Sequence, residues 1–342
     1  MDRGFDGTTI LVTGGLGFIG SNFIRDIHVR YPGARIVNID IEGYAANHAN
    51  LADIVADDWY TFVRADIADK LAMRKVFAAE RPDYVINFAA ESHVDRSIHG
   101  DTEAFVRTNV SGVHVLLEEL RVNPQVRTFL HVSTDEVFGS LPIGSSERFS
   151  ETSPYAPNSV YASTKAAGDH LCRAYFNTWK LPIVVTHSAN NFGPYQLPEK
   201  LVPFAIQRLL EGKTIPLYGD GLQVRDWLHV ADHVRALELC LLHGKPGSVY
   251  VVGAEEEKTN REIAERILSI LEKDASHIEY ITDRPGHDRR YASDSALIRK
   301  ELGWKPEHSF DDAFEITVTW YMTNQDWMQE VNSRLGNLNA HI

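Results

Sequence analysis

Two adjacent acids, Asp135 and Glu136, stand just after the apolar run of residues 129–132, which is typical of a buried strand. Two carboxyl groups in close reach push their pKa values apart, so one can donate a proton while the other accepts one. Lone carboxylates avoid the interior, whereas Ser, Thr and Asp often cap the element that follows a strand. Residues 133–139 therefore either cap a helix or line a site, and the rest of the chain favours a site.

Tyr161 and Lys165 have the i, i+4 spacing that places two side chains on one face of a helix. A nearby ammonium stabilises a phenolate, so we expect Tyr161 to accept a proton at a pH well below its ordinary pKa of about 10. Removal of a proton from a sugar hydroxyl during hydride transfer needs such a base. This spacing is common by chance. It becomes evidence for catalysis because it follows a part of the chain that has the pattern of a nucleotide-binding domain.

Three glycines, Gly14, Gly17 and Gly20, follow a β-branched run at 9–13 and open a helix-like stretch. Such a turn lets the backbone approach a pyrophosphate at a helix N-terminus. Asp40 ends the second strand, where an acid accepts hydrogen bonds from ribose hydroxyls and repels a 2′-phosphate. The pattern predicts NAD rather than NADP; the alternative is a turn that only packs a helix on a strand.

Strands and helices alternate through the first half of the chain. A third strand at 60–67 contains Asp66, which either accepts from the adenine amino group or caps a helix from Ala68. Further segments are a helix at 72–79, a strand at 84–90, a loop at 91–97, a helix at 105–120 and a strand at 182–186. This alternation predicts a doubly wound parallel sheet of the Rossmann type, with ligands at the carboxyl ends of its strands.

Composition narrows the class of protein. The chain has 342 residues and a formal charge of −13, which argues against non-specific binding to nucleic acid or to an anionic membrane. Cys172 and Cys240 lie in apolar helix-like segments and indicate buried thiols in a reducing compartment. With neither a signal peptide nor a run of transmembrane length, we expect a cytoplasmic protein.

Regularity falls after residue 190. We expect an NAD-binding domain over 1–190 with a return segment at about 225–255, a smaller mixed substrate domain over 191–330 and a tail over 331–342. Basic and aromatic residues gather at 225–227, 258–260 and 283–291. Such clusters suit a diphosphate, and the alternative is surface salt bridging.

The glycine spacing G-x-x-G-x-x-G resembles the extended short-chain dehydrogenase/reductase superfamily. Over about residues 8–325 the chain closely resembles dTDP-glucose 4,6-dehydratases, which act on nucleotide sugars. The motifs that carry this resemblance are Ala89-Ala90-Glu91-Ser92-His93-Val94-Asp95-Arg96-Ser97, Ser133 to Gly139, Asn190-Asn191, Pro198-Glu199-Lys200-Leu201, Gln223 to Trp227 and the 283–291 run. The related epimerases lack the Thr-Asp-Glu triplet.

The resemblance implies a three-step reaction. Hydride passes from C4 of glucose to NAD while Tyr161 takes the hydroxyl proton. Glu136 then removes the C5 proton as Asp135 protonates the departing C6 hydroxyl. Hydride finally returns to C6 and the 4-keto-6-deoxy sugar leaves. The resemblance also implies a homodimer, paired through the helices at 105–120 and 162–178, and no metal.

The resemblance assigns a role to each matching residue. The catalytic set is Thr134, which binds the C4 hydroxyl, with Asp135, Glu136, Tyr161 and Lys165. The cofactor set is Gly14, Gly17, Phe18, Ile19, Gly20, Asp40, Asp66, Ile67, Phe88, Ala89, Ala90, Ser92, Thr108, Tyr161, Lys165 and Asn191. The substrate set is Ser92, Thr134, Asn190, Glu199, Lys200, Leu201, Pro216, Tyr218, Arg225, Asn260, Arg284 and His287.

Some positions depart from the family pattern. Ile41-Glu42-Gly43 stands where Lys-Leu-Thr is usual, which puts the adenosine-side contacts in doubt, and Phe138 and Phe192 replace commoner tyrosines. The alternatives are a dehydratase of UDP-glucose or UDP-N-acetylglucosamine, a 4-epimerase, or a regulatory protein that holds NAD without turnover. The acid pair argues against an epimerase, and the intact Tyr161 and Lys165 argue against a protein without turnover.

Overall fold

A seven-stranded parallel sheet forms the centre of the computed structural model, which describes residues 4–55, 58–283 and 286–335. The strand order is β10-β6-β5-β4-β1-β2-β3, and all neighbours run parallel. The strands are β1 (Thr9–Thr13), β2 (Arg35–Asp40), β3 (Tyr60–Arg64), β4 (Tyr84–Asn87), β5 (Thr128–Thr134), β6 (Ile183–Ser188) and β10 (Val249–Val252). They are rich in buried Val, Ile and Leu, as a parallel sheet covered on both faces requires.

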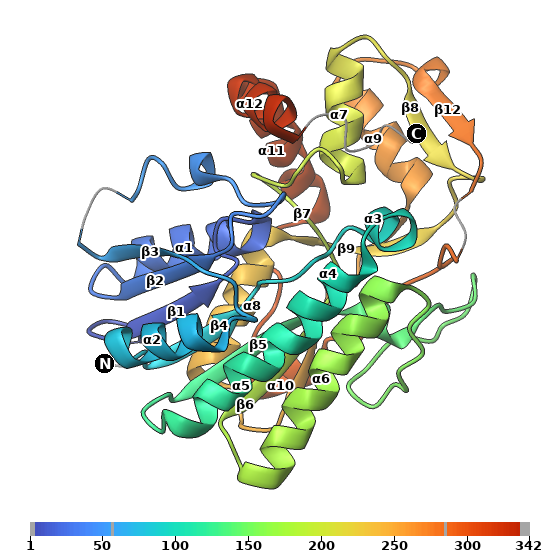
Figure 1. The fold of residues 1–342 in the computed structure, drawn as a ribbon. Helices are drawn as coiled ribbons and strands as arrows, with labels where there is room; N and C mark the ends of the chain where they lie inside the picture. The colour runs from blue at the N-terminus through green and yellow to red at the C-terminus, as the bar shows by residue number, and fades with distance from the viewer. Residues whose placement is uncertain (1–3, 56–57, 284–285, 336–342) are drawn as a thin grey trace.

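Helices cover both faces of this sheet (Figure 1). One apolar core joins the sheet to α1 (Phe18–Arg30), α8 (Val230–His243) and α10 (Ala296–Leu302). A second core joins the opposite face to α2 (Lys70–Glu80), α5 (Val113–Val122) and α6 (Val160–Trp179). The predicted doubly wound parallel fold is confirmed.

A smaller mixed part is built from two short sheets and four helices. β7 (Asn190–Phe192) pairs parallel with β9 (Val224–His229), which pairs antiparallel with β11 (Glu257–Thr259). The other sheet pairs β8 (Ile215–Tyr218) with β12 (Ile278–Ile281). The helices α7 (Leu201–Leu210), α9 (Asn260–Ile270), α11 (Phe310–Thr323) and α12 (Gln325–Leu335) pack with these strands around a separate core, in the upper part of Figure 1.

The chain crosses between the two parts more than once. After β9, α8 and β10 return to the large sheet, and α10 packs there through Ile298, with Trp304 just beyond its end in the same core. A division of the chain near residue 190 remains our proposal. Within the described ranges, no helix combines the length and apolar character needed to span a membrane.

Some predicted boundaries were wrong. α3 (Val94–His99) begins inside the predicted loop at 91–97, and the helix at 105–120 is composed of α4 (Thr102–Val106), a π-helical turn at Arg107–Gly112 and α5. Short 3-10 helices occur at η1 (His48–Asn50), η3 (Asp135–Phe138) and η4 (Ala275–His277).

The predicted tail is helical where it is described. In α12, Trp327, Met328 and Val331 form a buried stripe, and the Trp327 indole donates to Asn50 Oδ1 at 2.9 Å. This apolar stripe anchors the helix against the core of the smaller part. Residues 336–342 of the predicted tail lie outside the described residues.

Candidate active site

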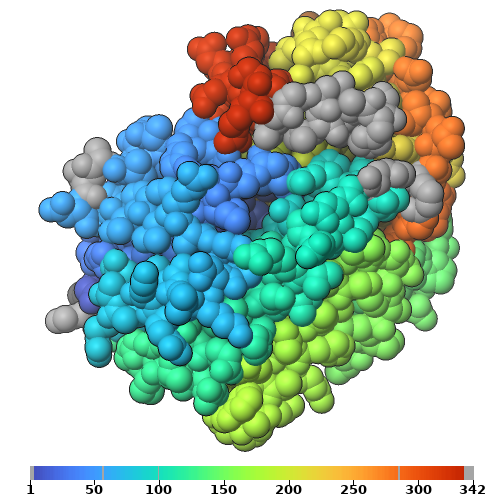
Figure 2. All heavy atoms as spheres, viewed as in Figure 1, coloured from blue at the N-terminus to red at the C-terminus, as the bar shows by residue number. Residues whose placement is uncertain are grey.

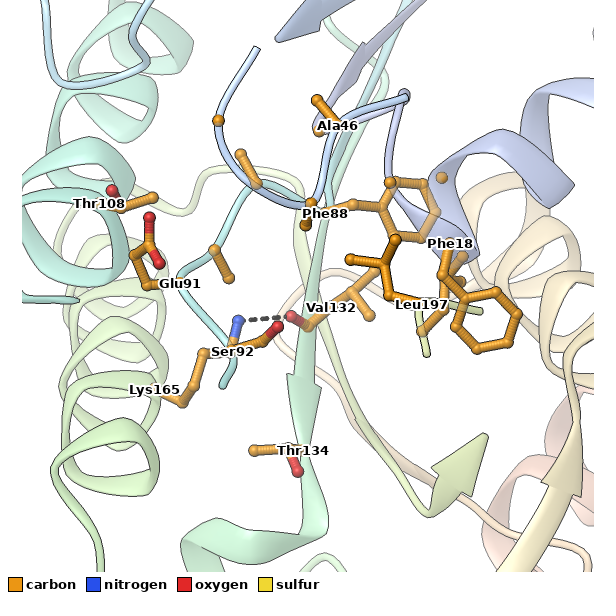
Figure 3. A pocket seen from close by; sticks show the side chains of 18 of the residues that line it. Phe18, Ala46, Phe88, Glu91, Ser92, Thr108, Val132, Thr134, Lys165 and Leu197 are labelled. Atoms are coloured by element: carbon orange, nitrogen blue, oxygen red, sulfur yellow. Dashed lines mark hydrogen bonds between the residues drawn. The ribbon is translucent and has the colours of Figure 1, made fainter. Parts of the chain in front are cut away.

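A cavity of about 320 Å³ opens at the carboxyl ends of β1, β2, β4, β5 and β6, where the smaller part closes over the sheet (Figures 2 and 3). Its walls come from the turn after β1, the loops after β2 and β4, the segment after β5, α6 and the 188–200 region. In an open α/β sheet, ligands bind in the crevice outside the carboxyl ends of the strands. Every residue of the predicted cofactor set lines this cavity.

The glycine turn forms a cradle that side chains would fill. Gly14 has a φ of 71°, and a Cβ there would lie 2.7 Å from the Ala89 backbone nitrogen. A Cβ on Gly20 would lie 2.5 Å from the Gly14 carbonyl oxygen. α1 begins directly after Gly17 without a side-chain cap, so its first backbone N–H groups can bind an anion. These features fit a pyrophosphate.

Asp40 is held at the end of β2. Its Oδ2 accepts from the Leu16 amide at 3.2 Å, and its Oδ1 accepts from the Glu42 amide at 2.9 Å. Burial raises the pKa of the Asp40 carboxyl from its ordinary value. The carboxylate therefore faces the cavity in a fixed orientation, as a ribose acceptor must.

Asp66 does not cap α2. Asp69 does so, accepting from the Leu71 and Ala72 amides at 2.9 and 3.1 Å. Asp66 instead accepts from the Ala68 amide at 2.8 Å and pairs with Arg107 at 2.6 Å. It still lines the cavity, so its contact with adenine stays a prediction.

The acid pair enters the same cavity. β5 ends at Thr134, whose Oγ1 accepts from the Glu136 amide at 3.3 Å and starts a short 3-10 helix. The segment closes at Gly139, where a Cβ would lie 2.4 Å from the Ala156 carbonyl oxygen, so a side chain is excluded. Residues 133–139 therefore do both of the things that the sequence left open: Thr134 caps the short helix, and that helix carries both acids to the cavity wall.

Asp135 is the buried member of the pair. It is 1% exposed, and its Oδ2 has no hydrogen-bond partner among the described residues. Burial raises the pKa of the Asp135 carboxyl well above its usual range, and the charges of Glu136 and Asp226 raise it further, while Arg225 opposes them. This shift favours the protonated form of Asp135, which is the form that a general acid needs.

Tyr161 and Lys165 project from one face of α6. The Lys165 ammonium donates to the Val132 carbonyl oxygen at 2.7 Å (dashed in Figure 3) and lies close to the end of β5. Burial raises the pKa of Tyr161 well above its ordinary value, Glu136 adds to the rise, and a hydrogen bond with Thr134 lowers it. The predicted depression of this pKa is not seen in the chain alone, because the phenol is buried and Glu136 adds to the effect of burial.

A buried polar network lies beneath Lys165, and the sequence analysis missed it. Asp169 Oδ2 accepts from Ser133 at 2.9 Å and from Tyr155 at 3.2 Å, and lies 3.0 Å from His187 Nε2. Burial alone would raise the pKa of Asp169, but the charge and hydrogen bond of His187 and the charges of His131 and Lys165 hold it below its usual value. Asp169 follows Lys165 by one helical turn, so the i, i+4 spacing was the available signal.

The loop after β2 was also missed. Tyr44 lines the cavity, its hydroxyl lies 3.5 Å from Glu199 Oε1, and the Arg96 guanidinium lies 4.2 Å above its ring. Burial raises the pKa of Tyr44 above its ordinary value. Only the family pattern could have singled out this irregular loop. Other lining residues outside the predicted sets are Ile39, Ile41, Gly43, Ala45, Ala46, Ala65, Glu91, Val132, Ser133, Ser188, Ala189, Gln196 and Leu197.

The predicted substrate set divides in two. Ser92, Thr134, Asn190, Glu199 and Lys200 line the cavity. The remaining described members do not line it: Leu201, Pro216, Tyr218, Arg225, Asn260 and His287. Arg284 lies outside the described residues.

Some of the distant members form a neighbouring polar group. Arg225 is buried, donates to the Asp288 carbonyl oxygen at 3.0 Å and stacks over Tyr291. The rings of Tyr218 and His287 lie 6.0 Å apart, and His287 Nδ1 lies 2.7 Å from Asp283 Oδ1. Arg225 acts electrostatically on Asp135, so this group borders the acid pair.

The sheet order, the uncapped glycine turn and the Tyr161–Lys165 pair on α6 define an extended short-chain dehydrogenase/reductase. Residues 11–317 match the family model described as GDP-mannose 4,6 dehydratase. The chain is 47% identical over 340 residues to the dTDP-glucose 4,6-dehydratase of Xanthomonas campestris, covering 94% of this chain and 95% of that protein. It therefore belongs to the dTDP-glucose 4,6-dehydratase family.

Solved structures agree with this assignment. A dTDP-glucose 4,6-dehydratase from Bacillus anthracis in complex with NAD matches with a TM-score of 0.89 and 42% identity, covering 95% of this chain and 99% of that one. The dTDP-glucose 4,6-dehydratase from Streptomyces venezuelae with NAD and TYD bound matches with a TM-score of 0.89 and 44% identity, covering 94% of this chain and 99% of that one.

Proposed function

We propose that this chain converts dTDP-glucose to dTDP-4-keto-6-deoxyglucose and water, as an NAD-dependent hydro-lyase. One observation carries the proposal: the buried Asp135 and its neighbour Glu136 line the same cavity as Tyr161 and Lys165, and burial raises the pKa of Asp135. An oxidoreductase that only moved hydride would need the tyrosine and lysine alone. The acid pair adds the means to eliminate water.

The residues present fit NAD. The cradle at Gly14 and Gly20, the open start of α1 and the acceptor Asp40 suit a pyrophosphate and a ribose without a 2′-phosphate. When bound, NAD supplies a hydride acceptor that is reduced in the first step and restored in the last. Lys165, Asn191 and the Phe88 to Ser92 loop would hold it against the sheet.

The residues of the chain then move the protons. Tyr161 accepts the C4 hydroxyl proton during the oxidation, helped by its hydrogen bond with Thr134. The resulting 4-ketone acidifies C5, from which Glu136 removes a proton while Asp135 protonates the C6 hydroxyl, which leaves as water. Glu136 returns its proton to C5 when hydride reaches C6.

The proton balance of this cycle has a consequence. Tyr161 ends the turnover protonated and Asp135 ends it ionised, so one proton must pass from the tyrosine to the aspartate, directly or through solvent. The raised pKa values of both groups agree with their resting as protonated acids in the free chain. Binding of substrate and the positively charged cofactor must lower the pKa of Tyr161 for the oxidation to start.

A substrate panel tests the proposal. The protein is incubated with dTDP-glucose, UDP-glucose and UDP-N-acetylglucosamine, and the alkali-induced ultraviolet absorbance of a 4-keto-6-deoxy product is measured. The proposal predicts fastest formation with dTDP-glucose. Faster turnover of a UDP-sugar would reassign the nucleotide, and absence of product with all three would refute a dehydratase.

We also propose a cytoplasmic homodimer. α5 and α6 lie side by side without another element over their outer sides in Figure 1, and they expose Val122 and Trp179. The unpaired, fully buried Cys172 and Cys240 agree with a reducing compartment. Light scattering should give the mass of two chains, and Trp179→Asp should shift it toward one; a monomeric wild type would refute the dimer.

A further inference from the structure

Three potential metal ligands meet where β9 passes into α8, outside the cavity described above. His229 ends β9, Asp232 lies in the first turn of α8, and His308 lies in the segment between α10 and α11. One ligand atom from each residue lies within 4.8 Å of the other two. The residues come from three elements, so only the fold brings them together.

His229 is a buried imidazole whose ring nitrogens lack a partner in the part of the chain that the structure describes. It is 9% exposed, and neither Nδ1 nor Nε2 has a hydrogen bond to any described residue. Its side chain does not cap α8, and its ring lies beside that of His308, with centroids 5.1 Å apart. Buried polar groups are normally satisfied, so an imidazole in this state points to a ligand.

Asp232 is already fixed in place. It is 3% exposed, and its Oδ1 accepts from the Glu307 amide and lies beside His308 Nδ1, both at 2.9 Å. Its carbonyl oxygen accepts from the Trp304 indole at 3.0 Å. These bonds hold the segment before α11 against α8, so the Asp232 carboxylate is positioned in advance.

We propose that His229, Asp232 and His308 bind one divalent transition-metal cation, with zinc as the best match. Two imidazoles and one carboxylate suit zinc, whereas calcium and magnesium prefer oxygen ligands. Tetrahedral ligands at zinc lie about 3.4 Å apart, from bond lengths of about 2.0–2.2 Å. The side chain of His308 is 38% exposed, so it can move to bring the ligand atoms from within 4.8 Å to the separation that zinc needs. Its solvent-exposed side admits the ion, and a water can serve as the fourth ligand.

The ion would link the smaller part to the cavity wall. His229 pairs in register with Phe192 on β7, and the preceding β7 residues Asn190 and Asn191 line the cavity. A metal bridge from β9 and α8 to the segment before α11 would stiffen this wall. The proposed site is therefore structural, and its occupancy is measurable without turnover.

The test uses the full chain without a histidine tag, stripped with a chelator and dialysed against zinc chloride. We expect about one zinc per chain by elemental analysis and a rise of several degrees in the unfolding temperature. Cobalt(II) in its place should give the visible absorption of a four-coordinate nitrogen and oxygen site. Binding far below one equivalent would overturn the proposal.

Two variants locate the site. His308→Ala removes a partly exposed ligand and should weaken zinc binding at least 10-fold. The unfolding temperature of the metal-free protein should fall only through the lost hydrogen bond with Asp232, because the Glu307 amide still donates to that carboxylate. His277→Ala is the matched control, because His277 also lies beside an aspartate, Asp274, but far from the cluster in sequence. Unchanged binding in His308→Ala, or equal loss in both variants, would refute the assignment. His229→Asn supplies a second ligand test should His308→Ala fold poorly.

Discussion

The Lys165 ammonium lies 2.7 Å from the carbonyl oxygen of Val132, two residues before Thr134. This bond fastens α6 to the end of β5, and thereby fixes the tyrosine of one element relative to the acids of the other. Asp169, one turn further along α6, adds a second link between α6 and β5 by accepting a hydrogen bond from Ser133. The proton-transfer groups therefore share one rigid frame.

Glu136→Gln should separate oxidation from elimination. The amide keeps the shape of the side chain but cannot take the C5 proton, so the first hydride transfer proceeds and water loss stalls. Absorbance of bound NADH near 340 nm should rise on addition of dTDP-glucose and persist, with product formation slowed about 10²- to 10⁴-fold. Product formation at the wild-type rate would exclude Glu136 as the base.

Asp135→Asn should also stall after oxidation, but for lack of an acid. A substrate with fluoride at C6 needs less protonation of its leaving group, so it should restore elimination in Asp135→Asn and not in Glu136→Gln. Because burial raises the pKa of Asp135, the wild-type elimination rate should fall on the alkaline side as this acid loses its proton. An analogue that rescues neither variant, or both equally, would contradict these two roles.

Tyr161→Phe should suppress the first step itself. Without the hydroxyl no group accepts the C4 proton, and we expect the NADH signal after sugar addition to form about 10²- to 10⁴-fold more slowly. Binding of NAD should change little, and tryptophan fluorescence titration checks this. An NADH signal as fast as that of the wild type would assign the base elsewhere.

Asp169→Asn should act through Lys165. Burial lowers the pKa of Lys165, and the negative charge of Asp169 opposes that fall. Loss of the charge should lower the pKa of Lys165, so the alkaline limb of the pH profile of the first hydride transfer should move to lower pH by about one unit. One unit corresponds to about 1.4 kcal/mol of interaction free energy between the two charges.

Tyr155→Phe provides the control for that experiment. It removes a hydrogen bond to Asp169 but keeps the carboxylate, so its pH profile should match that of the wild type although its unfolding temperature falls. Equal shifts of the profile in both variants would make the role of Asp169 merely structural.

The parts of the site that depend on local geometry could be predicted from the sequence. The glycine turn and Asp40 belong to one βαβ unit, whose spacing fixes their places. The Tyr161–Lys165 spacing likewise follows from a single helix. Each of these residues lines the cavity.

The parts of the site that depend on tertiary packing could not be predicted from the sequence. Pro216 and Asn260 belong to the predicted substrate set, yet they lie on elements of the smaller part whose placement relative to the sheet no local pattern encodes. The network around Asp169 joins β5, β6 and α6, and its histidines carry no periodic signal. The end of α12, residues 331–335, was taken for a tail because the apolar stripe of this helix is short and the partner of its Trp327, Asn50, is distant in the sequence.

Transfer of an isotope within one molecule tests the central claim most directly. dTDP-glucose carrying deuterium at C4 is converted in ordinary water, and the product is examined by NMR and mass spectrometry. The account predicts loss of one water and deuterium at C6, with ordinary hydrogen at C5. Deuterium that remains at C4 or is lost to solvent, or a product of unchanged composition, would contradict it.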